Sequence, residues 1–187
     1  AKIVRGGLLQ WKGKPLTSEI VRAEADSTVL RAGGVPEGTI VAGGRQACDP
    51  HERGHGPLRA HELIILDIFP RDACTGYFGD LTRTVVRGRA NTAQRQLWDT
   101  VCAAQRLAIR AIKPRAKGAA VHKAVQEFFV ARGYPTERRD GRWTGFFHGT
   151  GHGLGLDLHE EPRLGVTVFR KGQVFTVEPG LYYPEIG

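Results

Sequence analysis

Methionine is absent from the 187 residues, position 1 included, and no apolar run approaches the ~18 residues that a membrane-spanning helix needs. Because an intact translation product begins with methionine, we expect the N-terminus to have been processed or cut. The absence of a signal peptide is therefore weak evidence about location. The sequence itself predicts no membrane partner.

Cysteine is also scarce. The three cysteines, Cys48, Cys74 and Cys102, are odd in number and form no CxxC pair, which favours a reducing, cytoplasmic setting over a disulfide framework. None of them lies in a glycine-rich or cationic motif that would lower the pKa of a thiol. A thiol nucleophile is therefore the weaker alternative.

Positive charge is in excess, with 27 Lys and Arg against 19 Asp and Glu, a net charge of +8 and a pI near 9.8. This balance fits either an acidic partner such as nucleic acid or a basic soluble surface. The arginines are scattered from Arg5 to Arg170, without an RNP-like aromatic motif or a long basic stripe. A basic soluble surface is therefore favoured, and no nucleic-acid partner is predicted.

The length and the 41% apolar content predict one domain with its own hydrophobic core. Thr17 can cap a helix that runs to about Leu30, and Asn91 can cap the longest helix, which runs to about Ile112. A third helix is expected over residues 119–132, a turn over residues 71–75, and strands over residues 39–42, 63–69, 77–86 and 174–183. This order predicts an α+β fold in which helices cover one face of an antiparallel sheet.

The most informative stretch is residues 146–162, which read FFHGTGHGLGLDLHEEP. It holds three histidines spaced by glycines, namely His148, His152 and His159. Glycine makes up 25 of the 187 residues, and many of these glycines flank the motifs. Glycine at such positions indicates tight turns and close backbone approach.

Three acids accompany the histidines: Asp67 in LIILDIF, Asp80 in YFGDLTRT, and Glu178 at the end of VFTVE. Taken singly, each has a structural explanation; Asp67 can point outward or pair with an arginine, and Asp80 can pair with Arg83. An acid in a buried strand is nevertheless costly unless it is paired, hydrogen-bonded or metal-bound. Together with His152 they indicate a metal site, and its oxygen-rich donors suit Mn²⁺ or Co²⁺ ahead of a structural Zn²⁺.

These motifs, in this order, resemble those of the metallopeptidases with the pita-bread fold, which include methionine aminopeptidase, aminopeptidase P and prolidase. The resemblance covers nearly the whole chain. The ending VEPGLYYPEIG and the Pro-His of residues 50–51 are closer to the Xaa-Pro peptidase branch. The resemblance implies a curved antiparallel sheet covered by helices on one face, with the C-terminal strands missing. The expected domain is residues 1–187, a catalytic domain incomplete at both ends.

The resemblance also implies a ligand set for two divalent ions, Mn²⁺ or Co²⁺ being favoured and Zn²⁺ possible. The implied metal ligands are Asp67, Asp80, His152 and Glu178. Asp80 would bridge both ions, and Glu178 would also pass a proton from the nucleophilic water to the leaving amine.

The histidines implied to bind substrate and stabilise the tetrahedral intermediate are His51, His148 and His159. His51 and His159 count, with Glu178, as the implied catalytic residues. The other histidines match nothing in the family and are expected to be exposed or structural; they are His55, His61 and His122.

Two departures from the family are visible. The family carries a fifth, bridging glutamate in a Gly-x-Arg-x-Glu-Asp strand, which the sequence to Gly187 does not contain. Weak or mononuclear metal binding and little activity are therefore expected of residues 1–187 alone. The loop between Asp67 and Asp80 is slightly longer than usual, and its extra length, at residues 72–74, is expected to be accommodated at the turn.

The function so implied is metal-dependent hydrolysis of the bond before proline, in peptides or in Xaa-Pro dipeptides, with a peptide substrate and a possible homodimer. One alternative is a hydrolase of the same fold that acts on a small non-peptide amide or amidine, as creatinase does. The other is a module that has lost its metals and binds partners.

Overall fold

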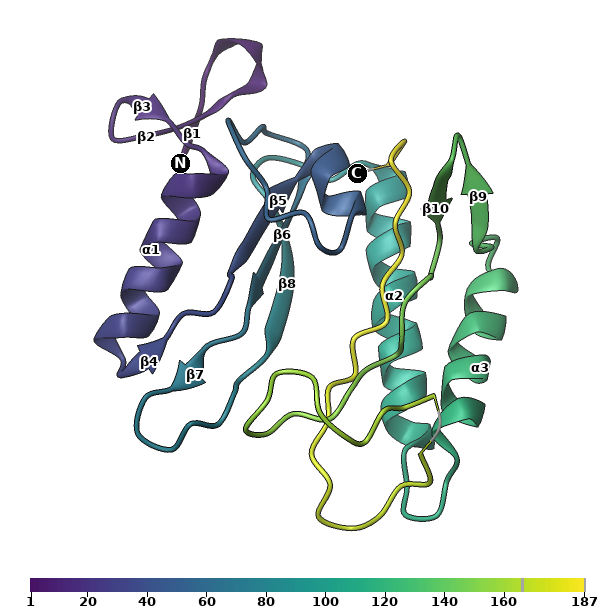
Figure 1. Ribbon diagram of the computed structural model, residues 1–187. Coiled ribbons are helices and arrows are strands. Elements are labelled where there is room, and N and C mark those ends of the chain that lie inside the picture. The colour runs from purple at the N-terminus through teal and green to yellow at the C-terminus, as the bar shows by residue number, and fades with distance from the viewer. Residues whose placement is uncertain (166, 187) are drawn as a thin grey trace. The chain divides into compact units, whose positions relative to one another are not determined.

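The computed structural model describes residues 1–165 and 167–186. They pack as two compact units: unit 1 comprises Ala1–Arg95 with the described residues from Pro184 onward, and unit 2 comprises Gln96–Tyr183. Both units contain helix and antiparallel strands, which confirms the predicted α+β class (Figure 1). No helix within the described ranges combines the length and apolar character needed to cross a bilayer.

The largest sheet of unit 1 is antiparallel, with the order β5-β6-β8. Its strands are β5 (Ile40–Gly43), β6 (Leu63–Ile68) and β8 (Leu81–Val86). β5 is buried on both faces: Val41 belongs to one apolar cluster, and Ile40 and Ala42 belong to another. Because side chains alternate between the faces of a strand, a slip of one residue would exchange both sets, and this burial fixes the register.

The other elements of unit 1 are short apart from one helix. They are α1 (Ser18–Arg31), β1 (Lys2–Ile3), β2 (Leu9–Trp11), β3 (Lys14–Pro15), β4 (Gly34–Val35), β7 (Arg71–Asp72) and the 3-10 turns η1 (Arg5–Gly7) and η2 (Gly44–Cys48). The predicted cap of α1 is confirmed, since Thr17 Oγ1 accepts a hydrogen bond from the backbone N–H of Ile20 at 3.3 Å. The helix packs against β5.

The prediction for residues 71–86 was partly wrong. Arg71–Asp72 forms β7 and pairs with β4, and β8 begins only at Leu81. The chain between them is held by Asp72, whose Oδ1 accepts hydrogen bonds from the hydroxyl and the backbone N–H of Thr75 and the backbone N–H of Cys74. These bonds lower the pKa of Asp72. The longer loop is therefore accommodated at this turn, as expected.

Unit 2 takes most of α2 (Thr92–Ala111), together with α3 (Gly118–Val130) and the hairpin of β9 (Glu137–Arg139) and β10 (Arg142–Thr144). The predicted cap of α2 is confirmed: Asn91 Oδ1 accepts from Gln94 N, and Gln94 Oε1 accepts from Asn91 N. On α3 the apolar spacing buries Val121, Val125 and Phe129. The ring of Phe129 meets that of Phe146 edge-on, with centroids 5.4 Å apart.

The strand expected over residues 174–183 is not formed as a continuous element. The segment pairs antiparallel with residues 145–153, but only through isolated bridges such as Gly153 with Phe175 and Gly145 with Tyr182. Between the two bridges the register changes by one residue, so the ladder is interrupted. The same interrupted pairing positions the candidate site of unit 2.

Candidate metal and substrate site

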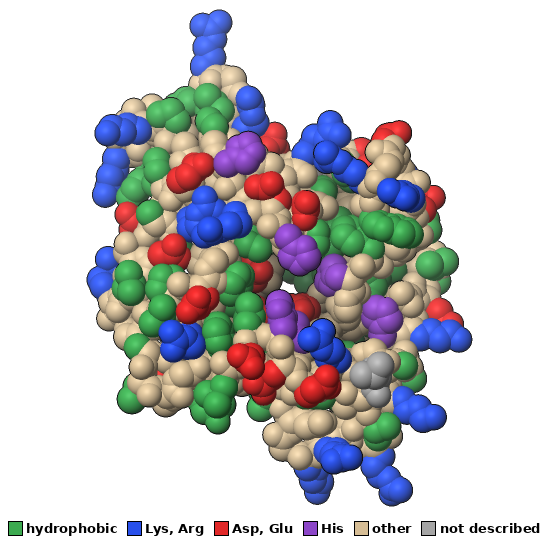
Figure 2. Space-filling view, in the orientation of Figure 1, with side chains coloured by type: hydrophobic (Ala, Val, Ile, Leu, Met, Phe, Trp, Pro, Cys, Tyr) green, Lys and Arg blue, Asp and Glu red, His purple; other side chains and the backbone are tan. Residues whose placement is uncertain are grey.

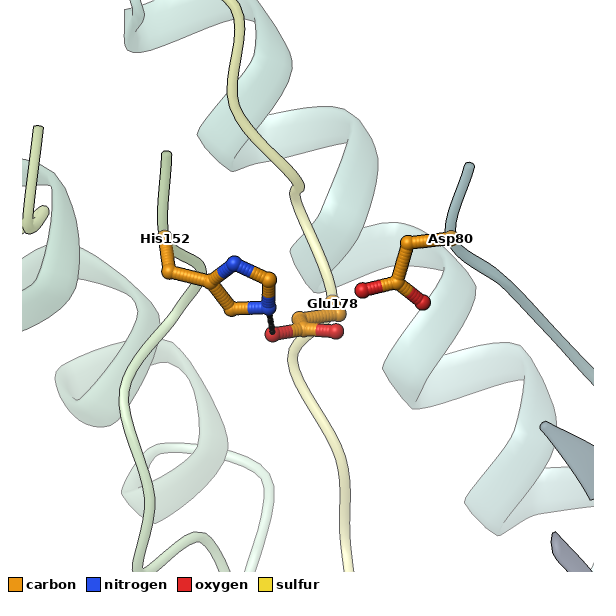
Figure 3. Close-up of side chains that lie close together, drawn as sticks. All are labelled: Asp80, His152 and Glu178. Carbon is orange, nitrogen blue, oxygen red and sulfur yellow. Dashed lines mark ion pairs between the residues drawn. The ribbon is translucent and has the colours of Figure 1, made fainter. Parts of the chain in front are cut away.

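The centre of the unit 2 site is the pair His152 and Glu178. The His152 N–H donates to Thr176 Oγ1 at 3.1 Å, Thr176 N donates to His152 O at 2.8 Å, and Glu178 N donates to Thr150 O at 2.8 Å. These bonds tie the two segments together, and His152 Nε2 lies 3.3 Å from Glu178 Oε1 (Figure 3). Both side chains are partly buried, with 15% and 33% of their surface exposed.

Two glycines make this close approach possible. A Cβ at Gly151 would overlap the backbone carbonyl of Thr176, and a Cβ at Gly153 would overlap the backbone of Glu161. Neither position has a positive φ, so the need for glycine here comes from space rather than from backbone conformation. The expectation that glycines of this motif mark close backbone approach is confirmed.

The hydrogen bonding of His152 sets its tautomer. Its Nδ1 lies 3.0 Å from the carbonyl oxygen of Gly153, and because a carbonyl only accepts, the proton belongs on Nδ1. In the neutral ring, the lone pair of Nε2 then faces a carboxylate oxygen of Glu178. Two electron pairs at this distance need a proton or a cation to hold them, and ligating histidines commonly bond a backbone carbonyl in this way. The pair therefore fits a divalent metal ion.

His148 and His159 have different surroundings. His148 Nδ1 lies 2.8 Å from Gly149 O, and its Nε2 lies 2.9 Å from the hydroxyl of Tyr182. The ring of His159, an exposed residue, meets that of His152 edge-on, with centroids 4.3 Å apart. Unit 2 thus brings His159 against the proposed ligand pair, and holds His148 through Tyr182.

Unit 1 carries the two candidate aspartates, one in strand β6 and one directly before strand β8. Asp67 lies in β6, opposite Thr82 of β8, and the Thr82 hydroxyl donates to Asp67 Oδ1 at 2.6 Å. Asp80 directly precedes β8 and is partly buried. The premise that Asp67 lies on a fully buried strand was wrong, because β6 is fully buried only at Leu63 and Ile64.

His51 lies in unit 1 after η2 and is exposed. Its backbone N–H donates to Asp49 Oδ1 at 2.9 Å, which fixes the local turn. His51 is therefore a surface residue of unit 1, and its role in substrate binding stays a prediction.

Two further residues of unit 2, to which the sequence assigned no site role, bond to the segments that carry the site. His122, expected to be exposed or structural, is partly buried on α3, and its Nδ1 lies 2.8 Å from the buried hydroxyl of Thr150. Burial lowers the pKa of His122. Tyr182 was passed over although it follows Glu178 in the same motif. The signal that could have pointed to Tyr182 was its place in the same extended segment as Glu178, two residues after Gly180.

Comparison with known proteins places this chain in a family. The model of metallopeptidase family M24 matches residues 5–187, and the chain belongs to this family. It is 34% identical over 153 residues to the Xaa-Pro dipeptidase of Pyrococcus furiosus, covering 80% of this chain and 41% of that protein. It is 36% identical over 165 residues to Xaa-Pro aminopeptidase 1 of Streptomyces coelicolor, covering 78% and 33%.

The fold agrees with the same family. The crystal structure of the prolidase from Pyrococcus horikoshii OT3 matches with a TM-score of 0.83 and 30% identity, over 92% of this chain and 49% of that one. The predicted pita-bread fold is thereby confirmed. The chain spans between a third and a half of the length of these relatives.

Proposed function

We propose that this chain carries the metal-binding and substrate-binding groups of a hydrolase that cleaves the bond before proline, in peptides or in Xaa-Pro dipeptides. The observation that carries the proposal is the His152–Glu178 pair, with Nε2 directed at the carboxylate and Nδ1 held by Gly153 O. The relatives named as Xaa-Pro dipeptidase and Xaa-Pro aminopeptidase support the substrate class.

The donor chemistry supports a divalent metal. The imidazole of His152 and the carboxylates of Asp80 and Glu178 are donors suited to Mn²⁺ or Co²⁺, with Zn²⁺ as the alternative. Asp67 adds a further carboxylate, and Asp80 is the proposed bridging ligand of a two-ion site. When bound, the ions supply Lewis-acid polarisation of a carbonyl and lower the pKa of a water molecule.

The protein groups supply proton transfer and binding. Glu178 holds two carboxylate oxygens, and we assign it the proton that leaves the attacking water and reaches the departing amine. His51, His148 and His159 are the proposed contacts of the peptide. Both nitrogens of His148 are engaged by Gly149 O and the Tyr182 hydroxyl, so its proposed contact is through the face of its ring, whereas His159 is suited because its imidazole is exposed. A homodimer and a cytoplasmic location stay predictions, as does the domain extent of residues 1–187.

The proposal is tested on the complete gene product by Mn²⁺ titration and by hydrolysis of Gly-Pro, comparing His152→Ala with His159→Ala. We expect His152→Ala to lower the metal affinity by at least about 100-fold, beyond the 10–100-fold of groups that only orient a ligand. His159→Ala should keep the metal affinity and lower kcat/KM.

Three outcomes contradict the proposal in different ways. Unchanged metal affinity in His152→Ala would remove this residue from the ligand set. Metal binding without cleavage of any Xaa-Pro peptide would favour a hydrolase of non-peptide amides or amidines. Failure of the wild-type protein to bind Mn²⁺, Co²⁺ or Zn²⁺ would favour a metal-free binding module. The weak or mononuclear binding expected of residues 1–187 alone is measured by the same titration.

A further inference from the structure

A cavity of about 450 Å³ opens within unit 2, beside His148. It lies between one face of α3, strand β10 and the segment that leads into the glycine-rich motif. Its lining residues are His122, Gln126, Thr136, Trp143, Phe146, Phe147, His148 and Gly149.

The walls are aromatic and firmly held. Phe146 is 1% exposed, and its ring meets those of His122, Phe129 and His148 with centroids 5.1–5.4 Å apart. Thr136 Oγ1 donates to Phe146 O and accepts from Phe146 N, which fixes the backbone at the same point. This part of the cavity is therefore preformed rather than dependent on a ligand.

The opposite wall is open to solvent. His122 and Gln126 lie four residues apart, one turn along α3, and so share one face of the helix. Trp143 of β10 is 56% exposed. The solvent-exposed indole of Trp143 can pack over an apolar group that enters the cavity.

The cavity carries little charge. Its lining holds no Lys, Arg, Asp or Glu. His122 is held by the Thr150 hydroxyl, and burial lowers its pKa, so its ring is neutral at neutral pH. A charged side chain would lose its water here without gaining an opposite charge, whereas an aromatic ring would lose little.

We propose that this cavity binds an aromatic side chain of the peptide substrate, that of the residue preceding proline. The inference rests on the proposed function, and the link between them is His148, which both lines the cavity and is a proposed contact of the peptide. His148 is bonded to Tyr182 on the segment that carries Glu178, which ties one wall of the cavity to that segment. Aromatic walls favour an aromatic occupant through edge-to-face and offset contacts.

The turnover test compares Phe-Pro with Gly-Pro, using the complete gene product with Mn²⁺. Gln126→Trp places a large ring in the cavity, and Glu127→Trp places the same ring at the next, exposed position of α3, which does not line it. We expect Gln126→Trp to lower the ratio of kcat/KM for Phe-Pro over Gly-Pro about tenfold, and Glu127→Trp to leave the ratio as in the wild type. An unchanged ratio in Gln126→Trp, or an equal fall in both variants, would overturn the inference.

A binding test separates this inference from the proposed function. N-acetyl-L-phenylalaninamide is titrated into the wild-type protein, and the indole N–H signal of Trp143 is followed by NMR, with that of Trp98, an exposed residue on α2, as the internal control. A saturable shift of the Trp143 signal alone supports the cavity even if no Xaa-Pro peptide is hydrolysed. Without hydrolysis, equal or absent shifts of both signals would overturn it.

Discussion

The two units hold their candidate site residues by different means. In unit 1, Asp67 sits in the regular ladder of β6 and β8, and Asp80 directly precedes β8. In unit 2, His152 and Glu178 lie in segments without regular secondary structure. The two segments are held together by a few hydrogen bonds between them and by glycines that allow their backbones to approach closely.

The difference shows what each arrangement tolerates. Six paired positions between β6 and β8 hold Asp67 in place, and apolar clusters pack on the two faces of the sheet. The neighbouring pairs can therefore absorb a change at one side chain. The His152–Glu178 pair depends on a few bonds and on the absence of a Cβ at Gly151 and Gly153. We therefore expect a single substitution to lower stability and metal affinity more in unit 2 than in unit 1 when it forces the two backbone segments of unit 2 apart.

The largest effect is expected from Gly151→Ala. The new methyl group would overlap Thr176 O and push the His152 segment from that of Glu178, lowering the free energy of unfolding by about 3 kcal/mol. Metal affinity should fall with it. Gly149→Ala is the matched control, since its Cβ would meet only atoms at 3.8 Å or more. Urea denaturation and Mn²⁺ titration measure both; similar values for the two variants would contradict the role of close approach.

A smaller effect is expected in unit 1, from Thr82→Val. It removes the hydroxyl that donates to Asp67 Oδ1 but keeps the branched shape that suits a strand. Because groups that orient a ligand are typically worth 10–100-fold, we expect a fall in Mn²⁺ affinity of about tenfold with little change in stability.

Thr84→Val, two residues along the same strand and opposite Ile65, serves as the control. Equal metal affinities in Thr82→Val, Thr84→Val and the wild type would show that the ladder alone positions Asp67, which would sharpen the contrast between the units.

The smallest effect concerns His122 and the pH dependence of stability. Burial lowers its pKa from the ordinary value of 6.5, so below that pH the unfolded chain binds more protons than the folded chain. The stability that the neutral ring contributes is present above pH 6.5 and is lost as the pH falls through the lowered pKa. Denaturation curves from pH 7.5 to 4.5 should show a shallower loss for His122→Asn, whose amide can replace Nδ1 at Thr150. A loss as steep as that of the wild type would refute this assignment.

Much of the local structure followed from the sequence. Thr17 and Asn91 cap the helices predicted for them, since capping is decided by side chains within three residues. β5 and β6 fell within one residue of their predicted bounds because short apolar runs rich in β-branched residues favour strands. The late start of β8 was missed because the hydrogen bonds of Asp72 to Cys74 and Thr75 form a turn, after which Phe78 pairs with Arg71 only as an isolated bridge.

The chemistry of the site was also present in the sequence, but not its support. The types and order of the motif residues predicted the family and the fold, because residue type and glycine spacing are local properties of the chain. The tautomer of His152, the bond between His148 and Tyr182, the burial of His122 and the cavity beside it were decided only by tertiary structure. Apart from the His152 tautomer, which rests on the carbonyl of the neighbouring Gly153, each depends on atoms far apart in sequence, and no local pattern encodes the distance between them.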